Sequence, residues 1–276
     1  MSTKGGRVID PLIERARNMW GLGNYGPIAE HLEPAAHALV DACAVTEGRR
    51  LLDVGAGTGN VALAAARRGA IVTATDLSPA MIAKGSARTN EAGVAVEWRE
   101  ANAEDLPFPD ASFDIVTSCF GAIFAPRHGR VARELTRVAS GGVVGLTAWT
   151  ADGFNSEMFS TMNEKLPPPP AGVGNAPQWG EEGYVRKLFD GLVDHLLIER
   201  RSVRFAYDSV EAARRHREAN AAPIIAFRAA VGEEVYTEVA EQQDEVVRRH
   251  NRATDGTVSY DADYLLIVAR AGDGPF

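Results

Sequence analysis

The sequence is poor in the features that mark secreted and membrane-spanning proteins. Only two cysteines occur among 276 residues, Cys43 and Cys119, and their spacing fits neither a metal site nor a redox pair. Both are interpreted as plain thiols in a reducing compartment. No apolar run of about 18 residues is present, and the N-terminal segment lacks the apolar stretch of a signal peptide. We therefore predict a cytoplasmic protein with no membrane span.

Positive charge is also scarce, with 29 Lys and Arg against 37 Asp and Glu and a net charge of -8. A protein that binds nucleic acid through its phosphates normally carries a basic surplus, so no nucleic-acid partner is expected. The six histidines have no spacing typical of metal ligands, and no metal site is predicted.

Between residues 50 and 150, short apolar runs typical of strands alternate with amphipathic runs typical of helices. Strict alternation of strand and helix indicates an α/β fold whose mostly parallel sheet is covered on both faces. Two later strand-like runs, 195–207 and 258–270, lack a crossover helix of the usual kind. They predict an antiparallel strand at one edge of the sheet.

A glycine-rich turn in the stretch "LLDVGAGTGN", residues 51–60, follows the first strand of this pattern. Glycines there allow positive φ and close approach of a ligand, although such a turn can also serve packing alone. Asp76 ends the next strand, 19 residues after Gly57, where an acid accepts hydrogen bonds from ribose hydroxyls. Asn60 breaks the dinucleotide fingerprint, and Asp53 disfavours a pyrophosphate nearby. These features predict a nucleoside ligand of cationic or zwitterionic character, which describes S-adenosylmethionine.

Four successive segments strengthen this interpretation, and each resembles a motif of the class I S-adenosylmethionine-dependent methyltransferases. They are "LLDVGAGTGNVAL", "TATDLSPAMI", "REANAEDLPFPDASFDIVTSCFGAIFAP" and "ELTRVASGGVVGLTAW". The likeness is greatest to the small-molecule group typified by the ubiquinone- and menaquinone-biosynthesis C-methyltransferases and secondary-metabolite methyltransferases. It implies a Rossmann-like sheet with an N-terminal helical arm and a helical cap.

The resemblance also implies S-adenosylmethionine as the cofactor and S-adenosylhomocysteine as the product. It assigns the cofactor to a set of residues in the motifs and the arm, namely Tyr25, Asp53, Gly55, Ala56, Gly57, Asp76, Leu77, Met81, Asn102, Ala103 and Ser118. The glycine turn would pass beneath the methionine part, with Asp53 near its ammonium and Asp76 on the ribose. Asn102 departs mildly from the family's usual Asp at the adenine edge. Tyr25 would close over the cofactor as a lid.

The expected reaction is methylation, on carbon or oxygen, of a small organic acceptor by in-line displacement. The acceptor is expected to be neutral or weakly charged, and to be a secondary metabolite or a quinone-like, prenyl or aromatic compound. No catalytic residue is assigned, because His128 and Glu157, which could reach an acceptor, are of types that are more often solvated. The acceptor pocket should be roofed by residues 151–190. Its candidate apolar walls are Trp149, Phe154, Met158, Phe159 and Trp179, with Phe120 facing the acceptor.

These patterns divide the chain into four parts. They are a helical arm or lid at 1–45, a cofactor-binding core at 46–150, a substrate cap at 151–193, and the last two strands at 194–276 with a helical insertion at 209–253. The arm is also a candidate for contacts in a homo-oligomer. Two other functions remain open at this point: a nicotinamide-dependent oxidoreductase on a similar sheet, and a non-catalytic binding protein with a methyltransferase-like core.

Overall fold

The computed structural model of the protein describes residues 3–4, 7–8, 10–139 and 141–271. A seven-stranded sheet in the order β5-β4-β3-β6-β7-β9-β8 forms its centre, and a small two-stranded sheet lies at the N-terminus. The strands are β1 (Thr3–Lys4), β2 (Arg7–Val8), β3 (Arg50–Val54), β4 (Ile71–Asp76), β5 (Val96–Glu100), β6 (Ile115–Cys119), β7 (Val143–Trp149), β8 (Val193–Tyr207) and β9 (Val258–Ala271).

Five strands of the central sheet, β3 to β7, pair in parallel, and this confirms the α/β prediction. The middle strands β3 and β6 are buried almost throughout, which is why their sequences are apolar without alternation. At one edge, β9 pairs antiparallel with both β7 and β8. The predicted antiparallel strand is therefore β9, and it lies one place inside the edge strand β8.

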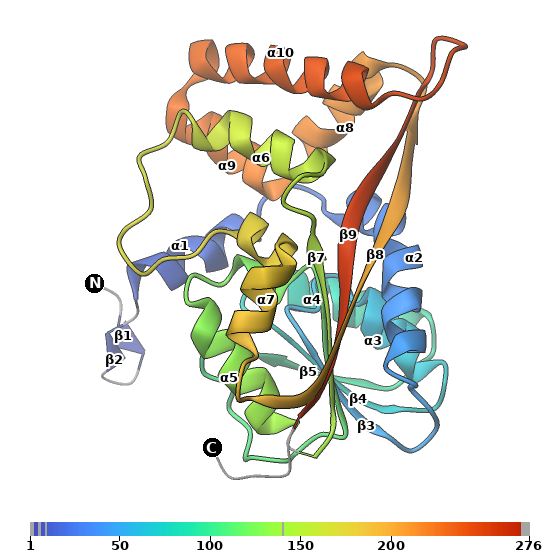
Figure 1. Ribbon diagram of the computed structural model, residues 1–276. Coiled ribbons are helices and arrows are strands. Elements are labelled where there is room, and N and C mark those ends of the chain that lie inside the picture. Colours follow the sequence, from blue (N-terminus) through green and yellow to red (C-terminus); the bar gives the residue numbers. More distant parts are fainter. Residues whose placement is uncertain (1–2, 5–6, 9, 140, 272–276) are drawn as a thin grey trace.

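Helices cover both faces of this sheet (Figure 1). On one face lie α2 (Gly26–Ala42), α3 (Asn60–Ala66) and α4 (Pro79–Glu91), and on the other lie α5 (His128–Val138) and α7 (Glu182–Leu188). Arg88 of α4 ties the first three together, since its guanidinium donates to the Asn60 side chain and pairs with Glu33 of α2. Short 3-10 turns, η1 (Ala122–Phe124) and η2 (Ala176–Gly180), precede α5 and α7.

A further helical layer lies beyond the carboxyl ends of the parallel strands (Figure 1). It contains α6 (Phe154–Asn163), α8 (Val210–Asn220), α9 (Ala222–Val231) and α10 (Glu233–His250). Strands β8 and β9 extend past the sheet to reach this layer, so the last three helices are inserted between two paired strands. The layer has its own small apolar core, which includes Met162, Phe227 and Tyr236.

The first long helix, α1 (Pro11–Met19), lies across the same end of the sheet. Arg17 forms an ion pair with Glu100 at the end of β5, and Asp10 pairs with Arg127 just before α5. The N-terminal arm is therefore held at two separated points over the carboxyl edge. In the described ranges, no helix has both the length and the apolar character needed to cross a bilayer.

Candidate functional site

The glycine turn after β3 has the backbone that its sequence predicted. Gly55, Gly57 and Gly59 all have positive φ, of 64°, 56° and 85°. Asp76, at the end of β4, accepts hydrogen bonds from the N–H of Gly57 at 2.9 Å and of Ser78 at 2.8 Å. Its carboxylate therefore fixes the turn to the neighbouring strand while it also lines a cavity above that turn.

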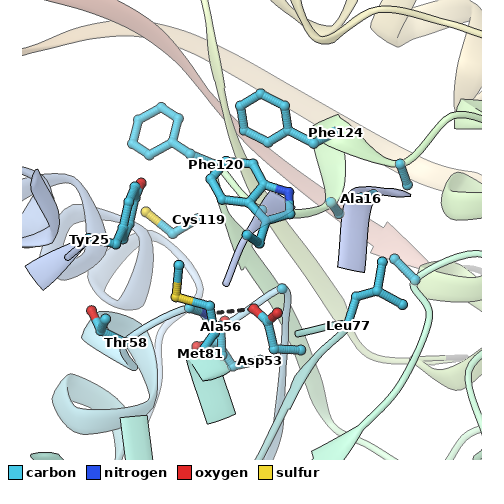
Figure 2. A pocket seen from close by; sticks show the side chains of 18 of the residues that line it. Ala16, Tyr25, Asp53, Ala56, Thr58, Leu77, Met81, Cys119, Phe120 and Phe124 are labelled. Carbon is cyan, nitrogen blue, oxygen red and sulfur yellow. Dashed lines mark hydrogen bonds between the residues drawn. The ribbon is translucent and has the colours of Figure 1, made fainter. Parts of the chain in front are cut away.

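This cavity, here called the turn cavity, encloses about 1020 Å³ with its mouth included. Ten of the eleven residues predicted to contact a cofactor line it, namely Tyr25, Asp53, Gly55, Ala56, Gly57, Asp76, Leu77, Met81, Asn102 and Ala103. In the view of Figure 2, the rings of Phe120 and Phe124 lie above the cavity, and Asp53, Ala56 and Met81 lie below it. Residues from Tyr25 to Phe124, distant in the sequence, thus meet at one end of the sheet.

Tyr25 and Asn102 both line this cavity. Tyr25 is the residue before α2, and its ring meets the Trp20 ring edge-on with centroids 6.0 Å apart. The side-chain oxygen of Asn102 accepts the N–H of Glu104 at 3.0 Å. A carbonyl oxygen has two lone pairs, so this bond leaves Asn102 able to accept one more hydrogen bond.

The remaining predicted residue, Ser118, does not line the turn cavity. Its hydroxyl donates to the Val54 carbonyl at 2.6 Å and accepts the Ala122 N–H at 2.8 Å. These bonds hold the loop after β6 against the glycine turn, where a Cβ on Gly121 would lie 2.3 Å from the Gly55 carbonyl oxygen. In this structure Ser118 does not contact the cavity but holds in place two segments that line it.

Two buried oxygens of the turn cavity have no hydrogen-bond partner among the described residues. They are Oδ2 of Asp53 and the hydroxyl of Thr58. Asp53 is 1% exposed, and burial raises the pKa of its carboxyl to about 7. The other Asp53 oxygen, Oδ1, accepts the Thr117 hydroxyl at 3.2 Å. A buried carboxylate with one oxygen unpaired suits a cationic group, so this cavity fits a ligand that carries an ammonium and does not suit a pyrophosphate.

Replacing Asp53 by Asn is expected to stabilise the ligand-free protein near pH 8 by about 1–3 kcal/mol. The unfolded Asp53 ionises near its ordinary pKa of 3.8, whereas the folded one stays protonated up to about pH 7. The wild-type protein therefore loses stability as pH rises through this window, and Asn has no such loss. Thermal unfolding without ligand at about pH 4 and 8 measures it.

The gain should shrink to well below about 1 kcal/mol at the lower pH, where the folded carboxyl is protonated and the unfolded one is only about half ionised. The same variant should show a smaller rise in melting temperature when S-adenosylhomocysteine is added, because the carboxylate is gone. A variant that is less stable than wild type at both pH values would contradict this account of Asp53.

A second cavity, here called the apolar cavity, adjoins the first and encloses about 860 Å³ with its mouth included. Five residues line both cavities: Trp20, Tyr25, Leu32, Phe120 and Phe124. Phe120 has φ of 55°, a conformation that is rare for residues other than glycine. Its N–H donates to the Thr147 hydroxyl at 3.0 Å and its ring stacks on Trp149 with centroids 3.9 Å apart, which holds it between the cavities.

Four of the five predicted apolar wall residues line the apolar cavity, namely Trp149, Phe154, Met158 and Phe159. Trp179 does not: it is fully buried, and its ring lies against those of His128 and Phe189. The roof consists of α6 together with residues of α8, α9 and α10, while η2 and α7 contribute no lining residue. The expectation of a roof from 151–190 was therefore right for α6 only.

Neither candidate base faces a cavity. His128 is 3% exposed, and burial lowers its pKa to about 4, so its ring is neutral. Its Nδ1 bonds the Tyr184 hydroxyl at 2.9 Å. Burial alone would raise the pKa of Glu157, but hydrogen bonds from Arg249 and His250 hold it below its ordinary value. Glu157 joins α6 to α10 and lines neither cavity.

Several residues that line the apolar cavity were not predicted from the sequence. They are Trp20, Asn155, Tyr207, His216, Arg217 and Gln243. One signal was present in the sequence: Gln243 lies seven residues after Tyr236, on the same buried stripe of α10 as Val239 and Val247. A polar residue on an apolar helical stripe indicates an internal polar site. The other residues carry no such pattern.

Comparison with known proteins places this geometry in a family. A profile for the methyltransferase domain matches residues 52–145. The chain is 45% identical over 189 residues to the uncharacterized protein Rv1403c of Mycobacterium tuberculosis, covering 68% of this chain and 69% of that protein. It is also 40% identical over 98 residues to the ubiquinone/menaquinone biosynthesis C-methyltransferase UbiE of Bartonella tribocorum, covering 34% and 38% of the two chains.

Among solved structures, the YcgJ protein of Bacillus subtilis matches with a TM-score of 0.56 at 20% identity, over 87% of this chain and 99% of that one. This likeness shows the shared fold. The matched domain includes the glycine turn and Asp76, and it confirms the predicted enzyme class and its cofactor, S-adenosylmethionine. The oxidoreductase alternative is thereby set aside. The chain belongs to the class I S-adenosylmethionine-dependent methyltransferases.

Proposed function

We propose that the enzyme transfers the methyl group of S-adenosylmethionine to a small organic acceptor held in the apolar cavity. The observation that carries this proposal is the shared wall of five residues between the two cavities. A methyl donor in the turn cavity and an acceptor in the apolar cavity would then be neighbours.

In this proposal, the residues of the turn cavity hold the cofactor. The backbone of Gly55, Ala56 and Gly57 passes beneath the methionine part, where the unpaired oxygens of Asp53 and Thr58 accept from the ammonium. The ribose hydroxyls donate to the Asp76 carboxylate, which has lone pairs left beyond its two backbone bonds.

Five other predicted residues contact the adenine and the methionine part of the cofactor. Leu77 and Met81 flank the adenine, and Asn102 and Ala103 meet its edge. Tyr25, which lines both cavities, closes over the methionine part.

When bound, S-adenosylmethionine supplies an electrophilic methyl group on a good leaving group, so the protein has mainly to position the acceptor and exclude water. Trp149, Phe154 and Met158 are each less than 9% exposed and face the acceptor space. Phe120, fixed by Thr147 and Trp149, sets the border between the two cavities. A small acceptor with an apolar body fits such walls.

The proposal is tested with S-adenosylmethionine that carries a labelled methyl group. The purified protein is incubated with panels of aromatic, prenyl and acidic metabolites, and separately with nucleic acid and protein. We expect label in a small organic product together with S-adenosylhomocysteine. Label only in a macromolecule would refute the small acceptor, and no product with any acceptor would favour a non-catalytic role. A cytoplasmic location and an oligomer formed through the arm stay predictions.

A further inference from the structure

Polar atoms without partners gather at the two cavities. Eight buried side-chain nitrogen or oxygen atoms lack a hydrogen-bond partner in the described part of the chain. Two of them, in Asp53 and Thr58, belong to the turn cavity. Three others belong to residues that line the apolar cavity: Nδ2 of Asn155, Nε2 of His216 and Nη1 of Arg217. Buried polar groups are normally paired, so each such atom points to a missing partner.

Arg217 brings positive charge to this otherwise uncharged lining. Its Nη2 bonds one oxygen of Asp244 at 3.1 Å, and Arg214 bonds the other oxygen at 2.5 and 2.9 Å. Two guanidinium groups thus share the Asp244 carboxylate, and Arg214 has the Glu218 carboxylate nearby as well, so the Arg217 charge is balanced only by its shared partner. The Arg217 side chain is only 12% exposed, so water screens that charge poorly.

His216 contributes an uncharged group beside Arg217. Its Nδ1 bonds the Tyr207 hydroxyl at 3.3 Å, and its ring lies against His31 with centroids 5.4 Å apart. Burial, together with His31 and Arg217, lowers the pKa of His216, so the ring is neutral near pH 7. When Tyr207 donates to Nδ1, Nε2 carries the hydrogen and becomes a donor.

The amide nitrogen of Asn155 and the free nitrogen of Arg217 are donors by their chemistry. With His216 in the tautomer described, all three unpaired atoms are hydrogen-bond donors. They therefore cannot form hydrogen bonds with one another, and each lacks an acceptor. An oxygen that carries negative charge is a strong acceptor for such donors. The rest of the lining is largely aromatic and aliphatic, which suits an apolar body on the same molecule.

We infer that the methyl acceptor is a small organic acid, with an apolar body and one anionic oxygen group that binds Arg217, His216 and Asn155. The anionic group is a carboxylate or a phenolate, which present the same acceptor chemistry. This inference rests on the proposed function and narrows it, since it names the class of acceptor and the residues that select it.

The test measures binding to the full chain saturated with S-adenosylhomocysteine, by calorimetry. The probes are 1-naphthoate, 1-naphthol and the neutral 1-naphthamide, which share one apolar body. We expect at least one of the first two to bind about tenfold or more tightly than the amide. Tight naphthoate binding identifies a carboxylate, and tight naphthol binding with proton release identifies a phenolate. Equal binding of all three, or no binding, overturns the inference.

Two matched variants locate the effect. Arg217→Gln should weaken binding of the preferred anionic probe about tenfold or more and leave the amide within about twofold. Arg215→Gln removes an exposed arginine of the same helix that lines neither cavity, so both probes should bind within about twofold of wild type. Equal losses in the two variants would assign the effect to folding and overturn the inference.

The comparison of probes on the wild-type protein needs no variant, so a poorly folded Arg217→Gln protein would not conceal the result. Failure of this inference is also distinct from failure of the proposed function. Labelled methyl transfer only to neutral amines or alkenes would refute the acid and keep the small acceptor. Transfer only to a macromolecule would refute the proposed function, whatever the probes bind.

Discussion

Replacement of Asp76 by Ala is expected to weaken S-adenosylhomocysteine binding by about a hundredfold or more. In the proposed site this carboxylate accepts both ribose hydroxyls, and each charge-assisted hydrogen bond contributes about 1.5–3 kcal/mol. The substitution also removes the acceptor of the Gly57 N–H, which holds the glycine turn to β4. Calorimetric titration of the variant with S-adenosylhomocysteine measures the loss.

Glu97→Ala is the matched control. Glu97 lies on the adjacent strand β5, opposite Thr73, and its side chain is exposed and pairs with Arg99. It lines neither cavity, so the control should bind within about twofold of wild type. Binding of S-adenosylhomocysteine by Asp76→Ala as tightly as by wild type would remove the basis for placing the ribose at β4.

Replacement of Met158 by Trp is expected to lower kcat/KM for methyl transfer about a hundredfold while cofactor affinity stays within about twofold. Met158 is 6% exposed and lines the apolar cavity, but it does not line the turn cavity. The larger indole takes up acceptor space, and displacement of an acceptor by about 1 Å is enough to cost a hundredfold in rate. Rates with an acceptor from the labelled panel, and titrations with S-adenosylhomocysteine, measure the two quantities.

Asn163→Trp adds the same ring to the last turn of the same helix, at an exposed position outside both cavities. Its kcat/KM should stay within about twofold of wild type. Overpacking of a buried position costs about 1–3 kcal/mol of stability, so the Met158→Trp protein must first be shown to be folded. If it transfers methyl groups at the wild-type rate, the acceptor does not lie beneath α6.

Much of the fold was predictable because local patterns and long-range packing agree in the core. β3 and β6 are buried on both faces, so their apolar runs identify central strands without an alternation to interpret. The helix at α4 has Pro79 in its first turn and ends just before Gly93, as the sequence indicated. The sequence did not predict that β9 lies one place inside the edge strand β8, because strand order depends on pairing between distant residues.

The two cavities differ in how much of their lining a sequence reveals. The turn cavity is built at the carboxyl ends of adjacent parallel strands, where short motifs such as Gly55–Gly57 and Asp76 meet by the rules of the fold. Ser118 shows the limit of that reasoning, since a residue at the right strand end can turn its hydroxyl to the backbone.

The apolar cavity takes residues from α8 and α10, inserted between β8 and β9, and no local rule relates them to α6. Arg217 lies in a charge-rich segment that resembles a solvated helix face. Only its approach to Asp244, 27 residues away, shows that one of its nitrogens is buried and unpaired. Trp179 was predicted as a wall of the acceptor pocket but is buried elsewhere, because the burial of a large ring does not show which part of the core it packs in.

By itself, the sequence determined the sheet, the glycine turn with its acid, and the cofactor that follows from them. These depend on backbone conformation and on contacts between neighbouring strands, which leave a signature in a few consecutive residues. The tertiary structure decided where the helices after β8 fold back and which nitrogens of Asn155, His216 and Arg217 remain without partners. Such features depend on side chains meeting across long stretches of chain, and burial of a charge is set only when those stretches pack together.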